Sequence, residues 1–184
     1  MKMHRFCGFL LLTILISFNA LAQTFGHLKT QVLFPSTPMY QSYIGEDVPG
    51  HAVPVSKGVE KIIYLTDRER EQYRVVIDKG IAYRTDSSPY QMHESKINYV
   101  LDSAGNIYFF ENEVRKELRH SSILAGAPVA AAGEMTVDKH GKILSVNRKS
   151  GHYKPAQQFF DSMLQVLSDS GVDLERIAVT GSAK

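Results

Sequence analysis

Three pairs of short runs rich in β-branched and aromatic residues dominate the middle of the chain, and a turn pattern separates each pair. The paired runs are "YRVVID" with "IAYRTD", "KINYVLD" with "IYFFE", and "GEMTVD" with "ILSVN". They are joined by "KG", "SAGN" and "KHGK", respectively. Such runs around a few turn-forming residues are typical of β-hairpins. The sequence therefore predicts three hairpins within residues 73–147 and a mainly antiparallel sheet.

Helical patterns lie on both sides of these hairpins. Thr66 followed by Glu69 forms a capping-box pattern, which predicts a short helix over residues 67–73. Near the C-terminus, apolar residues recur every three or four positions, at Phe159, Phe160, Met163, Leu164 and Leu167. This period is typical of one face of a helix.

The two ends of this longer helix also have signals. Pro155 suits its first turn, and Gly171 suits its C-terminal cap. Residues 118–124 and 174–181 are expected to add strands. The predicted fold class is α+β: a mainly antiparallel sheet of hairpins, a short N-terminal helix and one longer amphipathic helix near the C-terminus.

The N-terminus has the pattern of an export signal. Lys2 and Arg5 precede the apolar run of residues 6–18, and Ala20 and Ala22 form a small-x-small cleavage pattern. The apolar run is short for a bilayer span of about 20 residues, so we expect cleavage after Ala22 and no membrane association afterwards. The exported protein would be periplasmic or extracellular.

Three parts of the chain follow from this interpretation: a cleaved signal peptide (1–22), a proline-rich extended arm (23–56) and a single α+β domain (57–184). Four prolines in the arm disrupt regular structure. Its expected anchors on the domain are Phe34, Tyr40 and Tyr43.

Composition excludes several kinds of chemistry for the mature chain. The single cysteine is Cys7, within the signal, so neither a disulfide nor a cysteine nucleophile is expected. The formal net charge of +2 equals the charge of Lys2 and Arg5, which the signal also removes. Nothing in this balance indicates a nucleic-acid partner.

Polar residues gather beside glycines in "RHSSILAG" (119–126), "AAGEM" (131–135) and "SGHYKP" (150–155). The predicted catalytic candidates are His120, Ser121, Ser122 and Glu134, because imidazole, hydroxyl and carboxylate groups serve acid–base and nucleophilic chemistry. The predicted ligand-binding candidates are Arg84, His152 and Tyr153. The last two precede a helix N-terminus, which favours anions.

Each candidate also has a structural interpretation. His120 could bond backbone at a strand end, and the small residues could mark tight packing. His120, His140 and His152 lack close ligand spacing, so no metal site is predicted.

Four segments in order, "YLTDREREQYRVVIDKG", "RHSSILAG", "AAGEM" and "SGHYKP", resemble the core domain of the plant IQM proteins. That family is named for an IQ-type calmodulin-binding motif, and related uncharacterised domains occur in bacteria and fungi. The resemblance covers about residues 57–175. No IQ segment is found here, so the resemblance does not imply calmodulin binding.

A shorter run, "KGIAYRTDSSP", resembles the first conserved strand of cholera-toxin-type ADP-ribosyltransferases. This resemblance implies NAD as cofactor, with Arg84 on the pyrophosphate, Ser121 or Ser122 in the nicotinamide pocket and Glu134 stabilising the transition state. Only eleven residues separate Ser122 from Glu134, fewer than is usual in the toxin family.

Two functional hypotheses result. The first is an exported binding or effector-type protein whose polar pocket, built from the three glycine-containing segments, takes an unknown protein or a small anionic ligand. No cofactor is predicted for it. The alternative is an NAD-dependent mono-ADP-ribosyltransferase using Arg84, the serine pair and Glu134.

The export signal makes a direct prediction about the mature N-terminus. Because the cleavage pattern ends at Ala22, the exported protein should begin at Gln23. N-terminal sequencing of the protein recovered outside the cytoplasm measures this. A first residue of Met1 would contradict the prediction.

Overall fold

The computed structural model describes residues 33–48, 62–93, 96–111 and 115–181. The chain divides into two units, Met1–Val32 and Leu33–Lys184, and all described residues belong to the second. The predicted signal peptide and its cleavage site lie outside the described residues, so export stays a prediction. Residues 23–32 and 49–56 of the predicted arm also lie outside them.

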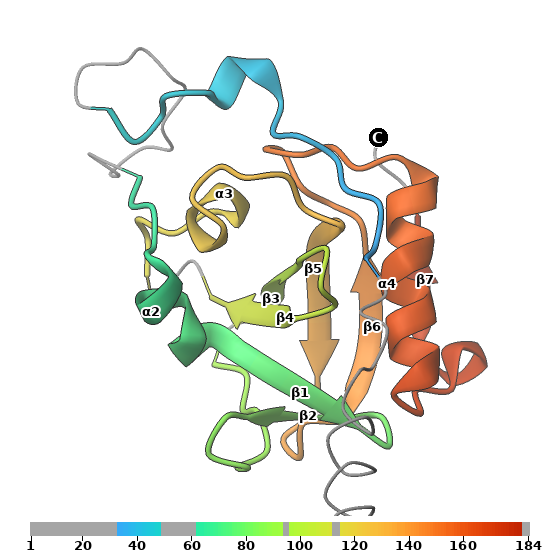
Figure 1. The fold of residues 1–184 in the computed structure, drawn as a ribbon. Helices are drawn as coiled ribbons and strands as arrows, with labels where there is room; N and C mark the ends of the chain where they lie inside the picture. The colour runs from blue at the N-terminus through green and yellow to red at the C-terminus, as the bar shows by residue number, and fades with distance from the viewer. Residues whose placement is uncertain (1–32, 49–61, 94–95, 112–114, 182–184) are drawn as a thin grey trace, which may run out of the picture. The chain divides into compact units, whose positions relative to one another are not determined.

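A curled seven-stranded sheet forms the centre of the described structure (Figure 1). Its strands are β1 (Arg74–Asp78), β2 (Ile81–Arg84), β3 (Ile97–Leu101), β4 (Ile107–Phe110), β5 (Ala131–Val137), β6 (Ile143–Asn147) and β7 (Ala178–Thr180). Their order in the sheet is β2-β1-β4-β3-β5-β6-β7. All neighbours are antiparallel except β6 and β7. The α+β class and the three hairpins are confirmed.

The sheet curls so far that β2 contacts the turn before β6. Ile81 and Lys142 form an isolated bridge. The Ala82 amide donates to the Gly141 carbonyl at 2.8 Å, and the Ile143 amide donates to the Gly80 carbonyl at 3.1 Å. Gly141 has φ +81°, and a Cβ there would lie 2.6 Å from the Ala82 carbonyl oxygen. A larger residue would therefore disturb this closure.

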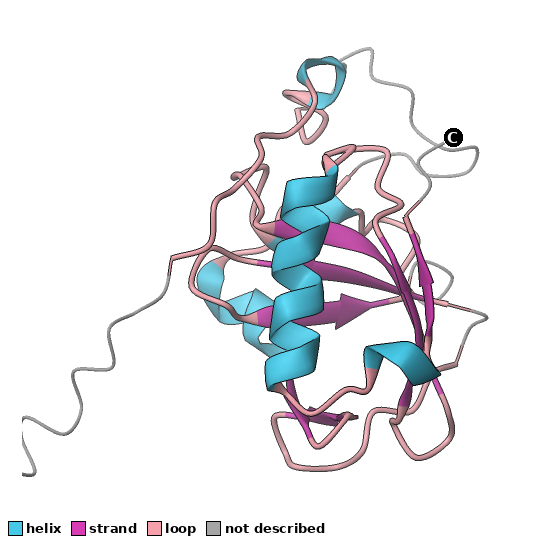
Figure 2. Cartoon of the chain, turned by 90° about the vertical axis from the view of Figure 1, so that its right-hand side faces the viewer, coloured by secondary structure: helices cyan, strands magenta, loops and turns pink. Residues whose placement is uncertain are grey.

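Helix α4 (Gln157–Asp169) covers the concave face of the sheet (Figure 2). Its residues Phe160, Met163 and Leu167 are fully buried, whereas Phe159 and Leu164 are half-buried. Together with inward-facing strand residues such as Tyr99 and Phe109, the helix forms what we call the inner core. The predicted apolar face of the helix is confirmed.

A second hydrophobic cluster, which we call the outer core, covers the opposite face of the sheet. It contains Val100, Tyr108, Phe110 and Ala132 from the strands. Other members come from connecting segments and from the arm: Met39, Leu65, Leu118, Ile123, Leu124, Val129 and Tyr153. Because every residue of β3 and β4 is buried, the central strands lie between two layers.

The prediction of a strand over residues 118–124 is wrong. The segment contains the single-turn helix α3 (His120–Ile123). The Arg119 amide donates to the Ser122 hydroxyl at 2.9 Å, a local bond that competes with a strand ladder. Ala125 and Gly126 then adopt left-handed conformations, with φ of 50° and 78°. The backbone thus reverses instead of extending.

The short helical pieces follow the predicted signals closely. In α2 (Asp67–Arg70), the Glu69 amide donates to the Thr66 hydroxyl at 3.3 Å, and the Thr66 amide donates to Glu69 at 2.9 Å. The predicted capping box is therefore confirmed. Other single turns are η1 (Gln41–Tyr43), η2 (Glu71–Tyr73) and η3 (Leu174–Arg176). None of the described helices has the length and the apolar character of a membrane-spanning segment.

Both ends of α4 match simple capping rules. Gly171 has φ +80°, its amide donates to Ser168 at 2.9 Å, and the Val172 amide donates to Leu167 at 2.9 Å. This is the Schellman arrangement, and it confirms Gly171 as the cap. Pro155 lies just before the N-cap Ala156, two residues before the first helical residue Gln157, so it is not in the first turn as predicted. Residues 174–181 contain η3 and then the short β7.

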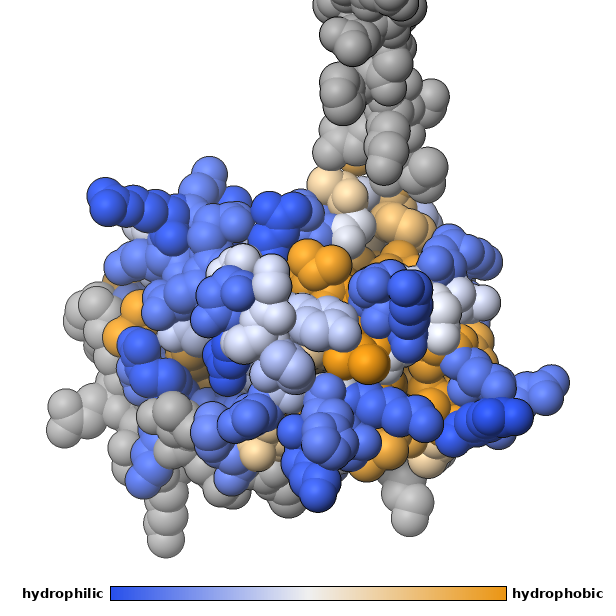
Figure 3. Space-filling view, turned by 90° about the horizontal axis from the view of Figure 1, so that it is seen from below, coloured by the Kyte–Doolittle hydropathy of each residue, from blue (hydrophilic) through white to orange (hydrophobic). Residues whose placement is uncertain are grey.

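The surface seen from below is mainly hydrophilic, with some apolar side chains between the polar ones (Figure 3). Alternation accounts for one exposed apolar side chain in β1: Val76 is 56% exposed and lies between Val75 and Ile77, which face the inner core.

The three predicted anchors of the arm differ from one another in their contacts. Phe34 packs against the inner core and Tyr43 against the outer core. Tyr40 is exposed, with the Lys154 ammonium 4.0 Å from its ring centroid.

The inner core makes α4 the clearest stability test. Leu167→Ala should lower the free energy of unfolding by about 2–5 kcal/mol, because it empties a fully buried site. Urea unfolding followed by circular dichroism measures the change. Gln158→Ala, at an exposed position of the same helix, should change it by less than about 0.5 kcal/mol. Equal effects of the two substitutions would contradict the packing of α4.

Candidate functional site

The carboxylate of Glu46, in the arm, lies at the meeting point of two of the predicted segments. Its side chain is only 2% exposed. The Ser121 hydroxyl of α3 donates to Oε1, and the His152 ring nitrogen Nε2 lies 2.9 Å from Oε2. The ring of Tyr43 lies against the His152 ring, with centroids 4.3 Å apart. "RHSSILAG" and "SGHYKP" thus approach each other through a residue of the arm. We call Glu46, Ser121 and His152 the Glu46 cluster.

Other polar groups surround this cluster. Burial raises the pKa of the Tyr64 hydroxyl, and the nearby carboxylates of Glu46 and Asp47 raise it further. Burial lowers the pKa of the Arg119 guanidinium, while Glu46 acts in the opposite direction. Tyr153 is buried, and its hydroxyl donates to the Ala127 carbonyl at 2.8 Å. The protein's own groups therefore take up the hydrogen-bonding capacity of this region.

The His120 side chain contacts other parts of the fold and not the solvent. It is buried, and its Nε2 lies 2.9 Å from the Gly133 carbonyl oxygen, so this nitrogen carries the proton. The Phe110 ring packs edge-on against it, with centroids 5.6 Å apart. Burial lowers the pKa of His120 to about 4. The ring is neutral at pH 7 and links α3 to β5.

Glu134 projects from β5 and is paired. It forms a salt bridge with Lys96, and its backbone amide donates to the Asn147 side-chain oxygen at 3.1 Å. Burial raises the pKa of Glu134, but Lys96, Lys149 and Asn147 together outweigh that effect, and the net result is a lowered pKa. The neighbouring Gly133 is a packing position, because a Cβ there would lie 1.9 Å from the Asn147 carbonyl oxygen.

Arg84 lies on the other face of the sheet from Glu134. Arg84 is opposite Val75 in the β1–β2 ladder, and Val75 belongs to the inner core. Glu134 is opposite Asn98 in the β3–β5 ladder, and Ala132, two residues earlier in β5, belongs to the outer core. Residues directly opposite each other, or two apart along a strand, share a face. Arg84 therefore does not line one cleft together with Glu134 and the serine pair.

A surface hollow of about 250 Å³ surrounds Arg84. We call it the Arg84 hollow, and it is lined by Gln72, Tyr73, Arg84, Tyr90, His93, Phe109, Phe110, Glu111 and Arg115. Two guanidinium groups, an imidazole and an amide are thus combined with aromatic walls. Of the residues predicted to form the functional site, only Arg84 lines this hollow.

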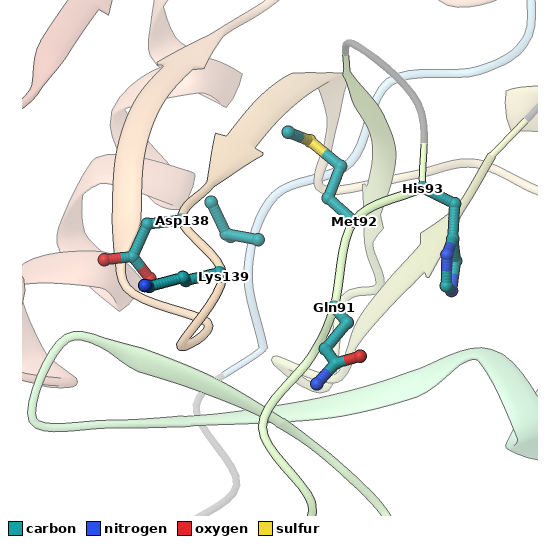
Figure 4. A pocket seen from close by; sticks show the side chains of 6 residues that line it. Gln91, Met92, His93, Asp138 and Lys139 are labelled. Carbon is teal, nitrogen blue, oxygen red and sulfur yellow. The ribbon is translucent and has the colours of Figure 1, made fainter.

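A second hollow of about 310 Å³ shares His93 with the first (Figure 4). Its other lining residues are Gln91, Met92, Val137, Asp138 and Lys139. The Asp138 carboxylate accepts the amides of His140, at 2.8 Å, and Lys142, at 3.0 Å, in the turn between β5 and β6. Its role there is to hold the turn. Across the described ranges, no three His, Cys, Asp or Glu side chains are grouped as a metal site would require.

Several residues of these sites were not predicted. Glu46 lies in a segment interpreted as an extended arm, and Arg115 has no motif around it. Tyr64 stands in the "YLTDREREQYRVVIDKG" segment, but nothing there distinguishes a polar from an apolar role. These polar residues can be recognised as parts of a site only once the fold shows which residues surround them.

The curled, mostly antiparallel sheet, covered by one long helix on one face and by short segments on the other, defines an α+β domain. The chain belongs to the IQM family. The model of the IQ motif-containing protein middle domain matches residues 69–160. The resemblance to the IQM core domain is confirmed.

The chain is similar to several curated plant proteins. The chain is 33% identical over 141 residues to the IQ domain-containing protein IQM3 of Arabidopsis thaliana, covering 73% of this chain and 30% of that protein. It is 31% identical over 125 residues to IQM2 of the same plant, covering 65% and 20%. The chain thus spans less than a third of the length of these relatives. No solved structure matches it.

The buried, neutral His120 predicts a specific pH dependence. Its pKa of about 4 in the folded state lies below the value of about 6.5 in an unfolded chain. The unfolded state therefore binds more protons between these values, and stability falls as the pH drops from about 6.5 to about 4. His120→Gln should lower the free energy of unfolding at pH 7, because packing is lost. The same variant should show a smaller decrease in that free energy between pH 7 and pH 4.5, because it lacks the titrating ring.

Urea unfolding at both pH values measures this slope. The matched control is His140→Gln, at an exposed position of the β5–β6 turn, which should keep the slope of the unmodified protein. An identical slope in the His120 variant and the unmodified protein would show that this ring does not stay neutral on folding.

Proposed function

We propose that this protein is an exported binding module that takes a small anionic ligand in the Arg84 hollow. The observation that carries the proposal is the Arg84 guanidinium itself. It lies in an open hollow and makes no ion pair with any described residue. By contrast, the described carboxylate, hydroxyl and imidazole candidates in the outer layer bond to other parts of the protein.

The guanidinium is held in place by a ring contact and not by a salt bridge, although the Asp86 carboxylate interacts with its charge electrostatically. Its carbon lies 4.4 Å from the Tyr90 ring centroid. That ring packs edge-on against Phe109, with centroids 5.2 Å apart, and its hydroxyl lies 3.1 Å from a Glu111 oxygen, to which it donates. Stacking on a fixed ring orients the guanidinium plane and leaves its N–H edge available for phosphate or carboxylate oxygens.

Arg115 supplies a second positive group at the same hollow. Its Nε donates to Glu117 at 2.5 Å, and its terminal NH1 lies 3.3 Å from the Tyr73 hydroxyl. The Glu117 carboxylate partly offsets the Arg115 charge. Arg84 is therefore the principal anion-binding group, and Arg115 is the supporting one.

The volume of the hollow and the Glu111 carboxylate in its lining restrict the size and the charge of the ligand. A volume of about 250 Å³ is below the range of roughly 300–1,000 Å³ that holds drug-sized molecules. The Glu111 carboxylate in the lining accepts the His93 amide at 2.8 Å and repels a second negative charge close by. A small oxyanion that also carries an O–H donor, such as hydrogenphosphate, suits both features.

The export part of the proposal rests on the signal pattern of residues 1–22. The relatives carry the words "IQ domain-containing" in their names, and the segment shared with this chain matches the middle domain of that family. Calmodulin recognition is left out of the proposal because no IQ segment is found in the sequence.

Isothermal titration calorimetry with inorganic phosphate and pyrophosphate tests the hollow, at constant ionic strength set with sodium chloride. The protein should bind one of these anions, and Arg84→Ala should weaken binding at least about tenfold, as expected for loss of a charge-assisted contact of about 1.4 kcal/mol or more. NAD is titrated in parallel, because the transferase alternative requires it.

Arg176→Ala is the matched control. Arg176 is exposed, is paired with Asp173 and lies next to the opposite edge of the sheet, so its loss should leave binding unchanged. Absence of any binding, or equal affinities of the unmodified protein and Arg84→Ala, would contradict the proposal. Binding of NAD but neither simple anion would favour the alternative.

A further inference from the structure

The Glu46 cluster has the composition of a carboxylate receptor. One carboxylate oxygen accepts the Ser121 hydroxyl, and the other lies 2.9 Å from the His152 ring nitrogen. The Arg119 guanidinium is close enough to interact electrostatically with the same carboxylate. Hydroxyl and imidazole donors on separate oxygens, beside a guanidinium, are groups that proteins use to bind carboxylates.

The carboxylate and its donors come from distant parts of the chain. Glu46 is 75 residues from Ser121 and 106 residues from His152 in sequence. Ser121 belongs to α3, and His152 belongs to the loop between β6 and α4. Because those two elements pack on the outer face of the sheet, the donors are positioned by the domain and not by the arm.

The arm is attached to the domain independently of Glu46. Thr37 and Val129 exchange two backbone hydrogen bonds, of 2.8 and 3.0 Å, and the Tyr40 amide donates to the His152 carbonyl at 2.7 Å. Met39 is buried in the outer core. Removing the Glu46 side chain therefore leaves the backbone of the arm held beside the donors, with a space of carboxylate size in front of them.

We propose that Ser121 and His152, with Arg119 nearby, form a carboxylate-binding site that Glu46 occupies as a built-in ligand. A free small carboxylate takes the same position when the Glu46 side chain is absent. In the intact protein, a carboxylate ligand has to displace this part of the arm to reach the donors. The site is distinct from the Arg84 hollow, because the lining of that hollow includes neither Glu46, Ser121 nor His152.

Rescue of Glu46→Ala by acetate tests the proposal in the full chain. The variant should melt at a lower temperature than the unmodified protein, because it leaves buried donors without their acceptor. Sodium acetate should raise that melting temperature by several degrees in a saturable way, whereas sodium chloride at the same ionic strength should not. The unmodified protein and Glu175→Ala, which changes an exposed carboxylate, should show no acetate-specific shift.

Two further variants connect the response to the proposed donors. Adding His152→Ala to Glu46→Ala should abolish the acetate response. Adding Arg84→Ala should preserve it, which separates this site from the hollow of the proposed function. If Glu46→Ala is unfolded in chloride, acetate-dependent recovery of its circular dichroism spectrum is the equivalent measurement.

The proposal is overturned if acetate and chloride act equally on Glu46→Ala, or if the response survives loss of His152. It is also overturned if Glu46→Ala neither loses stability nor responds to acetate. Loss of the response in the Arg84 variant would assign the acetate effect to the other site.

Discussion

The central strands β3 and β4 are buried on both faces, and the rest of the structure follows from the need to cover them. Every residue of these strands is buried, so the sheet needs a layer on each side. The inner face is covered by α4, whose apolar residues have the period that such a contact requires. The outer face has no long helix among the described elements. It is covered by α3, by connecting segments and by part of the N-terminal arm.

This difference between the layers explains where the polar chemistry lies. Short irregular segments bring backbone and polar side chains into the outer layer, and each buried polar atom then needs a partner. Such partners are present: no side-chain nitrogen or oxygen that is buried in the described residues lacks one. His120 bonds to Gly133, Ser121 bonds to Glu46, and Glu134 pairs with Lys96. The residue types that suggested catalysis thus hold irregular segments against a sheet.

Arg84 differs because it stands near the end of an edge strand. Among the described strands, β2 pairs along its length with β1 alone; its other edge bonds to residues 88–90, and its C-terminal end lies away from the closure at Ile81. The side chain is therefore left beside a hollow, where the Tyr90 ring orients it. Arg84 is the one residue of the transferase hypothesis that lines this hollow, and Glu134 lies on the other face of the sheet.

The sequence by itself determined the local structure of this protein, together with its family. The hairpins, the Thr66–Glu69 capping box and the Gly171 cap each depend on residues a few positions apart, so their signals are complete within a short segment. The α3 turn was missed because "HSSIL" has strand-like apolar positions, and only the local bond to the Ser122 hydroxyl favours the turn. The tertiary structure alone decided that Glu46 meets Ser121 and His152, and that Arg84 and Glu134 occupy opposite faces. Those outcomes depend on strand order and on the alternation of side chains across several ladders, which no single segment of the sequence contains.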